Sequence, residues 1–168
     1  MFDPFLGLGT TVFVAEELNR VPYGIEYDQQ RFEWVAGQLQ HWTNIRHADS
    51  ARLNRLGLPK MDLCLTSPPF IRKSDKWNPL FAGDPAKAGY DLYLKQMGRI
   101  FAQVAQLMKK RARVVVQVDH LPGRITTPLV HDFARVISPH LIFEQETIVA
   151  YRGGDPAYRH THCLVFRA

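Results

Sequence analysis

Short apolar runs alternate with amphipathic stretches along this chain, and this alternation limits the folds that it can adopt. Strand-like runs occur at 23–27, 45–49, 61–66, 113–118, 141–151 and 159–166. Helices are expected at 12–19, 28–42, 91–110 and 127–137. Such strand–helix alternation, closed by a final pair of strands, predicts an α/β fold: a doubly wound, mostly parallel sheet with an antiparallel C-terminal edge strand.

The 168 residues are expected to form a single domain, 1–168, with an irregular insertion at 71–90. A hydrophobic content of 46% supports a packed core. The chain has no membrane-spanning apolar run and no N-terminal secretion signal, so we expect a cytoplasmic protein without a membrane partner. Cys64 and Cys163 are expected to be buried free thiols, although a disulfide is compatible with the sequence. A net charge of +5 favours a polyanionic partner without proving one.

The stretch Thr66-Ser67-Pro68-Pro69-Phe70 follows the apolar run Leu63-Cys64-Leu65 and ends a predicted buried strand. Proline has no N–H group and a fixed φ, so a central strand cannot continue through two prolines. The carbonyl groups around them would point outward at the carboxyl end of the sheet, where open α/β sheets bind ligands. This arrangement suits a clamp for the amino group of a flat base. A tight turn with a hydrophobic anchor is the alternative.

A glycine turn opens the chain in the stretch Asp3-Pro4-Phe5-Leu6-Gly7-Leu8-Gly9-Thr10-Thr11. Gly7 and Gly9 allow a sharp turn and a close approach of the backbone to a ligand. Thr10 or Thr11 is expected to cap the helix that follows. A single Gly-x-Gly is weak evidence on its own, but here it lies between a strand and a helix, which is the context that ligand binding requires.

Acidic residues follow three predicted strands at Asp3, Glu26 and Asp49. Glu26 lies 17 residues after Gly9, close to the spacing at which an acid binds a ribose diol in dinucleotide folds. Tyr27 is placed to cover an adenine ring, and Asp49 to accept a hydrogen bond from its amino group. Each acid alone could be a solvated residue at a strand end, but together they outline a nucleoside pocket.

The glycine turn between Asp3 and Thr11 and the stretch from Thr66 to Phe70 resemble two motifs of the S-adenosylmethionine-dependent DNA amino-methyltransferases. These enzymes methylate cytosine N4 or adenine N6. The glycine turn resembles the cofactor motif of that family, and the Ser-Pro-Pro-Phe form of the catalytic motif is closer to the cytosine enzymes. The final stretch, His162 to Arg167, resembles the last strand of the family. The resemblance implies a Rossmann-like methyltransferase fold with S-adenosylmethionine as cofactor. The predicted cofactor-binding residues are Asp3, Phe5, Gly7, Gly9, Thr10, Thr11, Glu26, Tyr27, Asp49 and Thr66.

The predicted catalytic residues are Ser67, Pro68, Pro69 and Phe70. Hydrogen bonds from the target amine to the Ser67 hydroxyl, and to the carbonyl of Ser67 or Pro68, would favour a pyramidal and more nucleophilic nitrogen. Phe70 would stack on the base, which must leave the duplex. Positioning and electrostatics would then supply the rate without a metal or a covalent intermediate. His160 and His162 share one strand face, but without a second ligand cluster we expect no metal site.

Basic and aromatic residues alternate in the insertion after the catalytic motif. Arg72, Lys73, Lys76 and Trp77 are the predicted nucleic-acid-binding residues, with DNA more strongly expected than RNA. A solvated surface loop is the alternative. The basic cluster between Lys109 and Arg113 is expected at a helix C-terminus, where cations offset the helix dipole.

The sequence departs from the family pattern at three points. Leu8 replaces a small residue, and Phe70 replaces the commoner tyrosine. Asp3 follows only two residues, so the chain is expected to be short at its N-terminus, because a first strand usually has about five residues. Three readings follow: a DNA methyltransferase, an RNA guanine-N2 methyltransferase, and a catalytically weak partner subunit. The sequence is compatible with a homodimer and with a restriction partner, and it favours neither.

Overall fold

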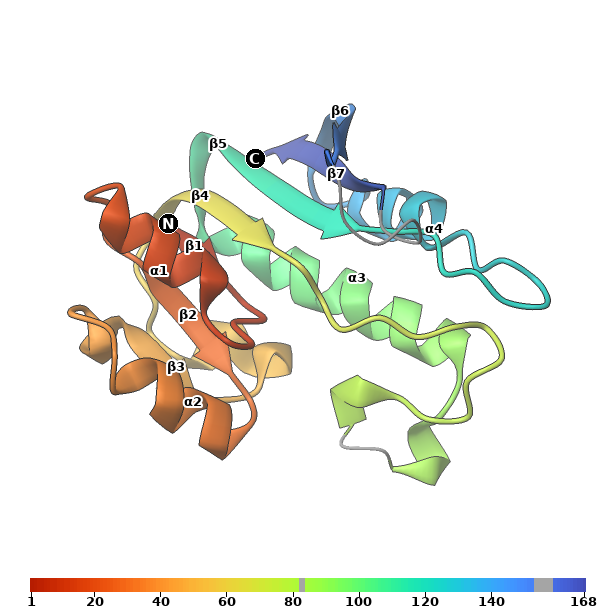
Figure 1. The fold of residues 1–168 in the computed structure, drawn as a ribbon, viewed down its shortest axis with the longest axis horizontal. Coiled ribbons are helices and arrows are strands. Elements are labelled where there is room, and N and C mark those ends of the chain that lie inside the picture. The colour runs from red at the N-terminus through yellow and green to blue at the C-terminus, as the bar shows by residue number, and fades with distance from the viewer. Residues whose placement is uncertain (82–83, 153–158) are drawn as a thin grey trace.

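The computed structural model describes residues 1–81, 84–152 and 159–168. Within these residues, one seven-stranded sheet has the order β3-β2-β1-β4-β5-β7-β6 (Figure 1). Strands β1 to β5 run parallel, and β7 is antiparallel to β5 and β6. The strands are β1 (Phe2–Asp3), β2 (Tyr23–Glu26), β3 (Ile45–His47), β4 (Met61–Thr66), β5 (Met108–Val118), β6 (Ile142–Ala150) and β7 (His160–Arg167). The predicted fold class is confirmed.

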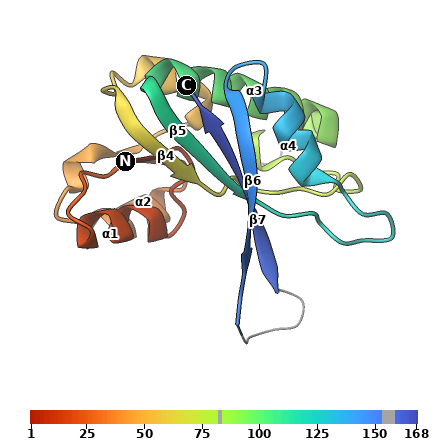
Figure 2. The same cartoon turned by 90° about the horizontal axis from the view of Figure 1, so that it is seen from above.

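Helices cover both faces of this sheet. Figure 2 shows α1 and α2 on one side and α3 and α4 on the other. The helices are α1 (Thr10–Glu17), α2 (Gln29–Ala36), α3 (Tyr90–Leu107) and α4 (Leu129–Ile137), with 3₁₀ turns η1 (Trp42–Asn44), η2 (Ser50–Arg55), η3 (Pro79–Phe81) and η4 (Pro85–Lys87). The strand order reverses between β1 and β4, so their carboxyl ends form the topological switch point at which such sheets bind ligands.

The main core lies between the sheet and α3 with α4. The helical spacing of Tyr93, Met97, Phe101 and Val104 places these side chains on one buried face of α3. They belong to the same core cluster as the buried side chains of β5. A smaller cluster under α1 and α2 contains Leu6, Val12, Val35, Leu39 and Ile45. The two cores hold the carboxyl ends of β1 and β4 in fixed positions.

Several helix ends differ from the expected ones. Helix α1 begins at Thr10 with Gly9 at its N-cap, in a left-handed conformation and with no side-chain cap, so the prediction that Thr10 or Thr11 caps the helix is wrong. Helix α2 ends at Ala36 rather than near Trp42, because Gly37 forms its C-cap. Leu39, beyond that end, is still buried, which explains why its spacing looked helical.

The basic cluster near Lys109 lies in strand β5 and not at a helix C-terminus. Helix α3 ends at Leu107, and Lys109 instead forms an ion pair of 2.7 Å with Asp62 of β4. Cys64 is buried and Cys163 is partly exposed, and both are free thiols. Residues 153–156 of the predicted connector between the last two strands lie outside the described residues. No helix in the described part of the chain is long and apolar enough to span a membrane.

Candidate functional site

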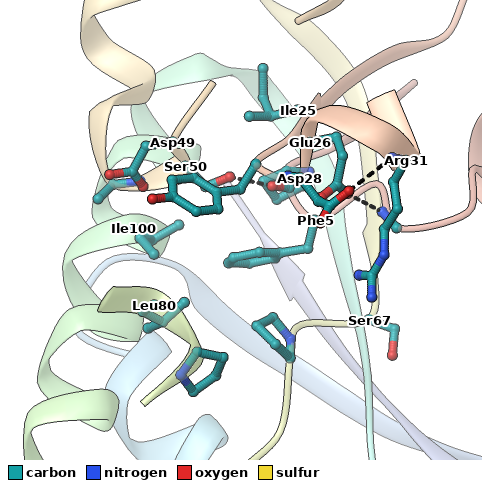
Figure 3. Close-up of a pocket in the computed structure, with 16 residues that line it drawn as sticks. Phe5, Ile25, Glu26, Asp28, Arg31, Asp49, Ser50, Ser67, Leu80 and Ile100 are labelled. Atoms are coloured by element: carbon teal, nitrogen blue, oxygen red, sulfur yellow. Dashed lines mark hydrogen bonds between the residues drawn. The ribbon is translucent and has the colours of Figure 1, made fainter. Parts of the chain in front are cut away.

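A cavity of about 370 Å³ opens at the carboxyl ends of β1, β2 and β4 (Figure 3). This volume lies within the usual range for small-molecule and cofactor sites. The lining residues are Pro4, Phe5, Gly7, Ile25, Glu26, Tyr27, Asp28, Arg31, Asp49, Ser50, Ala51, Ser67, Pro69, Pro79, Leu80 and Ile100. The cavity therefore joins residues of the predicted cofactor motif to residues of the predicted catalytic motif.

The glycine turn forms the part of the wall between β1 and α1. Gly7 and Gly9 have φ values of +56° and +81°, which L-residues with side chains rarely adopt. A Cβ atom on Gly9 would lie 2.9 Å from the side chains of Phe13 and Val35. Gly7 lines the cavity, whereas Gly9, Thr10 and Thr11 are not among the lining residues. Gly9 thus allows α1 to pack closely, and Gly7 brings bare backbone to the cavity.

Glu26 ends β2 and is largely buried, with 7% of its surface exposed. One carboxylate oxygen accepts a hydrogen bond of 2.7 Å from the Gly7 N–H, and the other accepts one of 2.8 Å from the Asp28 N–H. These bonds fix the carboxylate at the edge of the cavity. Because a carboxylate can accept about four hydrogen bonds, two acceptor positions remain for a ligand. Tyr27, the next residue, is exposed and also lines the cavity.

Asp3 is buried behind the cavity wall. Its carboxylate accepts hydrogen bonds from the Thr66 hydroxyl at 2.6 Å and from the Phe5 N–H at 3.0 Å. Burial raises the pKa of Asp3 above its usual value, while hydrogen bonds from Thr66, Phe5 and Thr11 oppose this shift. Asp3 and Thr66 therefore connect β1 to β4 across the switch point. They hold the wall in place and do not themselves line the cavity.

The segment after β3 forms another side of the cavity. The Asp49 carboxylate caps η2 by accepting a hydrogen bond of 2.8 Å from the Ala51 N–H. The Ser50 hydroxyl donates a hydrogen bond to the Pro4 carbonyl, which ties this segment to the glycine turn. Asp49 thus lies in the cavity wall, where the sequence predicted an acceptor for an adenine amino group.

The Ser67–Phe70 turn leaves β4 beside the cavity. Ser67 is exposed, and Ser67 and Pro69 line the cavity, whereas Pro68 is buried. The Tyr93 hydroxyl donates a hydrogen bond of 2.9 Å to the Pro69 carbonyl. Phe70 packs edge to face against Phe133, with ring centroids 6.5 Å apart, and does not line the cavity. Only part of the predicted catalytic motif thus faces the cofactor-sized cavity.

Several lining residues were not predicted from the sequence: Asp28, Arg31, Ser50, Ala51, Pro79, Leu80 and Ile100. Arg31 lies in the first turn of α2, and Figure 3 shows its side chain extending toward the side of the cavity where Ser67 lies. Arg31 lies five residues after Glu26 in the sequence, and this closeness could have indicated that it lines the same cavity. Pro79 and Leu80 come from the irregular insertion, where no local pattern marks the cavity-lining residues.

The predicted nucleic-acid-binding residues lie on the surface beyond the turn. Arg72, Lys73, Lys76 and Trp77 are exposed, and none of them lines the cavity. The Arg72 side chain donates to the Pro122 carbonyl at 3.1 Å, and the Lys73 N–H donates to the Thr127 hydroxyl at 3.0 Å. These bonds fix the start of the insertion against the loop that precedes α4.

His160 and His162 lie on one face of β7, with ring centroids 5.2 Å apart. Among the described residues, no group of three His, Cys, Asp or Glu side chains is arranged to hold a metal ion.

No protein-family model matches the sequence, and no curated protein matches it. The fold, in contrast, matches many solved structures. TrmN from Thermus thermophilus is 18% identical with a TM-score of 0.68, and the match covers 99% of this chain and 42% of TrmN. The chain thus spans less than half the length of TrmN.

Two further structures match at similar levels. Magnesium protoporphyrin IX methyltransferase (ChlM) from Synechocystis PCC 6803, solved with bound SAM, is 13% identical with a TM-score of 0.61; the match covers 99% of this chain and 68% of ChlM. TTHA0409, also from Thermus thermophilus and described as a DNA modification methylase, is 18% identical with a TM-score of 0.51; the match covers 71% of this chain and 50% of that protein. The chain has a Rossmann-like methyltransferase fold. At these identities the likeness establishes the fold alone.

Proposed function

We propose that this protein transfers a methyl group from S-adenosylmethionine to the exocyclic amino group of a base in DNA, with cytosine N4 as the favoured target. The observation that carries the proposal is the single cavity shared by the glycine turn, Glu26, Asp49 and Ser67. This cavity supports the proposal because the predicted cofactor motif and the predicted catalytic motif, about 60 residues apart in the sequence, both contribute to its wall at the switch point of the sheet.

The residues present fit the proposed cofactor. Glu26 has two unused acceptor positions for a ribose diol, and its carboxylate is held in place by backbone N–H groups. Tyr27 and Asp49 supply an aromatic ring and an acceptor for an adenine ring in the same cavity. Gly7 presents backbone without a Cβ atom to the same cavity. When bound, the cofactor supplies an electrophilic methyl group on a sulfonium ion.

The Ser67 turn supplies the groups that would hold the target amine. The amine donates one hydrogen bond to the Ser67 hydroxyl oxygen and one to the carbonyl of Ser67 or Pro68. The Pro69 carbonyl accepts a hydrogen bond from the Tyr93 hydroxyl, which holds the turn in place. Held in this way, the amine would direct its nitrogen lone pair at the methyl group that the bound cofactor would supply, and it would lose a proton to water.

Labelled methyl transfer to duplex DNA and to RNA, followed by nucleoside analysis, tests this function. We expect N4-methylcytosine from DNA, and at least a hundredfold loss of transfer in Ser67→Ala. Ser74→Ala is the matched control, because Ser74 is an exposed serine in the following segment and does not line the cavity. Methylation of RNA guanine alone would move the proposal to the RNA enzymes. Full activity of Ser67→Ala would contradict the role given to the turn.

A further inference from the structure

The β6–β7 hairpin extends beyond the carboxyl end of β5. The last pair between β5 and β7 joins Val118 to His162, whereas β6 and β7 remain paired as far as Ala150 and His160. A further hydrogen bond of 2.8 Å joins the Tyr151 N–H to the Arg159 carbonyl. Figure 2 shows the hairpin projecting from the sheet as a two-stranded ribbon.

The base of this hairpin is fixed to the end of β5 by Asp119. Its carboxylate accepts a hydrogen bond of 2.8 Å from the Thr161 hydroxyl and one of 3.2 Å from the His162 N–H. Thr161 is 3% exposed, and Asp119 is partly exposed. The hairpin is therefore held to the sheet at its base.

Residues 151–152 and 159–160 of the hairpin are exposed, and two of them are arginines. Tyr151 is 47% exposed, and Arg152, Arg159 and His160 are also exposed. Every residue of β6 is exposed, which is unusual for a strand in a packed sheet.

Hydrogen bonds and ring contacts connect this hairpin to residues 72–77, the basic segment that follows the Ser67–Phe70 turn. The His120 ring lies 5.3 Å from that of His162 and 5.0 Å from that of His131, between centroids. The loop after His120 is in turn hydrogen-bonded to Arg72 and Lys73. The connected elements form a surface that we call the basic arc, made of residues 72–77, 120–127, 151–152 and 159–160.

Acidic side chains near the basic arc already have partners in the protein. Asp75 accepts from the Arg72 N–H, Asp132 from Tyr90, and Glu146 pairs with His162. In contrast, Lys73, Lys76 and Arg124 form no ion pair with any carboxylate of the described residues. These three cations are thus available to an external anion.

We propose that the β6–β7 hairpin is a second nucleic-acid contact, in which Arg152 and Arg159 bind the phosphate backbone of duplex DNA. This inference rests on the proposed function and gives the substrate a second contact at the other end of the basic arc from residues 72–77. A two-stranded β-ribbon has dimensions that fit the major groove. Phosphate contacts of this kind position a duplex without reading its sequence.

Fluorescence anisotropy with a labelled DNA duplex at several salt concentrations tests the inference. Replacing both Arg152 and Arg159 by alanine is expected to weaken binding about tenfold and to lower the slope of log K against log salt by roughly 2. The control replaces Arg20 and Lys110, which are exposed near the amino ends of β2 and β5, and should leave the affinity within about twofold of wild type. Circular dichroism checks the fold of both variants.

The possible outcomes separate this inference from the proposed function. Equal affinities of the two double variants, or no binding of DNA by the wild-type protein, would overturn the role of the hairpin. A wild-type protein that binds DNA through Arg152 and Arg159 but transfers no methyl group would leave the hairpin contact standing and remove the proposed function.

Discussion

The hydroxyl group of Tyr93 donates a hydrogen bond of 2.9 Å to the carbonyl of Pro69. Tyr93 is fully buried in α3, and Pro69 is the second proline of the turn that leaves β4. Burial raises the pKa of the Tyr93 phenol, so it remains a donor at all physiological pH values. The main core thereby fixes the position of the turn that we propose to hold the target amine.

Tyr93→Phe should lower kcat for methyl transfer by about tenfold with little change in cofactor affinity, because only the turn loses its anchor. The free energy of unfolding should fall by about 1 kcal/mol, a usual value for one hydrogen bond. Tyr90→Phe is a matched control: Tyr90 lies on the same helix and donates an equal bond of 2.9 Å to Asp132. Equal kcat values for the two variants would contradict a positioning role for Tyr93.

Glu26→Gln should weaken cofactor binding by at least tenfold. The carboxylate accepts from two backbone N–H groups, and the NH₂ group of glutamine would face one of these donors. Equilibrium dialysis with labelled S-adenosylmethionine measures the change. Glu33→Gln is the control, because Glu33 is exposed on α2 and does not line the cavity. An unchanged affinity in Glu26→Gln would remove Glu26 from the cofactor site.

Gly9→Ala should destabilise the fold by about 2 to 4 kcal/mol. A left-handed φ costs an alanine roughly 1 kcal/mol, and the added Cβ would also lie 2.9 Å from Phe13 and Val35. Gly57→Ala separates these effects, since Gly57 has a φ of +62° with no atom within 4 Å of an added Cβ. Urea unfolding should therefore show a clearly smaller loss for Gly57→Ala. Equal losses would mean that the close packing of α1 contributes nothing.

His120 should make the stability of the protein depend on pH. Burial lowers its pKa, the nearby His131 and His162 lower it further, and Glu146 and Asp119 oppose the shift. In the unfolded chain a histidine has a pKa near 6.5, so below this pH His120 binds a proton more readily in the unfolded state than in the folded state. The free energy of unfolding should therefore fall as the pH drops below about 6.5.

Urea unfolding between pH 7.5 and pH 5.5 measures this dependence, and His120→Gln should reduce it. The control is His140→Gln, because His140 is exposed after α4. If His120→Gln and the wild type show the same pH dependence of stability, that dependence comes from other groups and the role of His120 is contradicted.

Strand β4 shows how far local sequence can predict this structure. Its predicted bounds, Met61 to Thr66, match the observed ones, because a buried apolar run ended by two prolines has few alternatives. The doubly wound, mostly parallel sheet follows from the alternation of strands and helices. In contrast, the placement of Lys109 in β5 depends on the pairing of β5 with β4, a contact between distant segments that no local pattern contains.

The sequence predicted some residues of the candidate site and missed others. Glu26 and Asp49 were found because residues at the carboxyl ends of parallel strands gather at one edge. Leu80 and Ile100 were missed because the insertion and α3 reach the cavity only through tertiary packing. The stacking of Phe70 on a base stays a prediction. In the structure its ring packs edge to face against the ring of Phe133.

Calorimetric titration of the wild-type protein with S-adenosylmethionine tests the central claim most directly, because every proposed role of the cavity depends on that ligand. We predict saturable binding at one site per chain, lost on adding an excess of S-adenosylhomocysteine as competitor. A folded protein that shows no binding heat at several temperatures, and retains no labelled cofactor in dialysis, would contradict it.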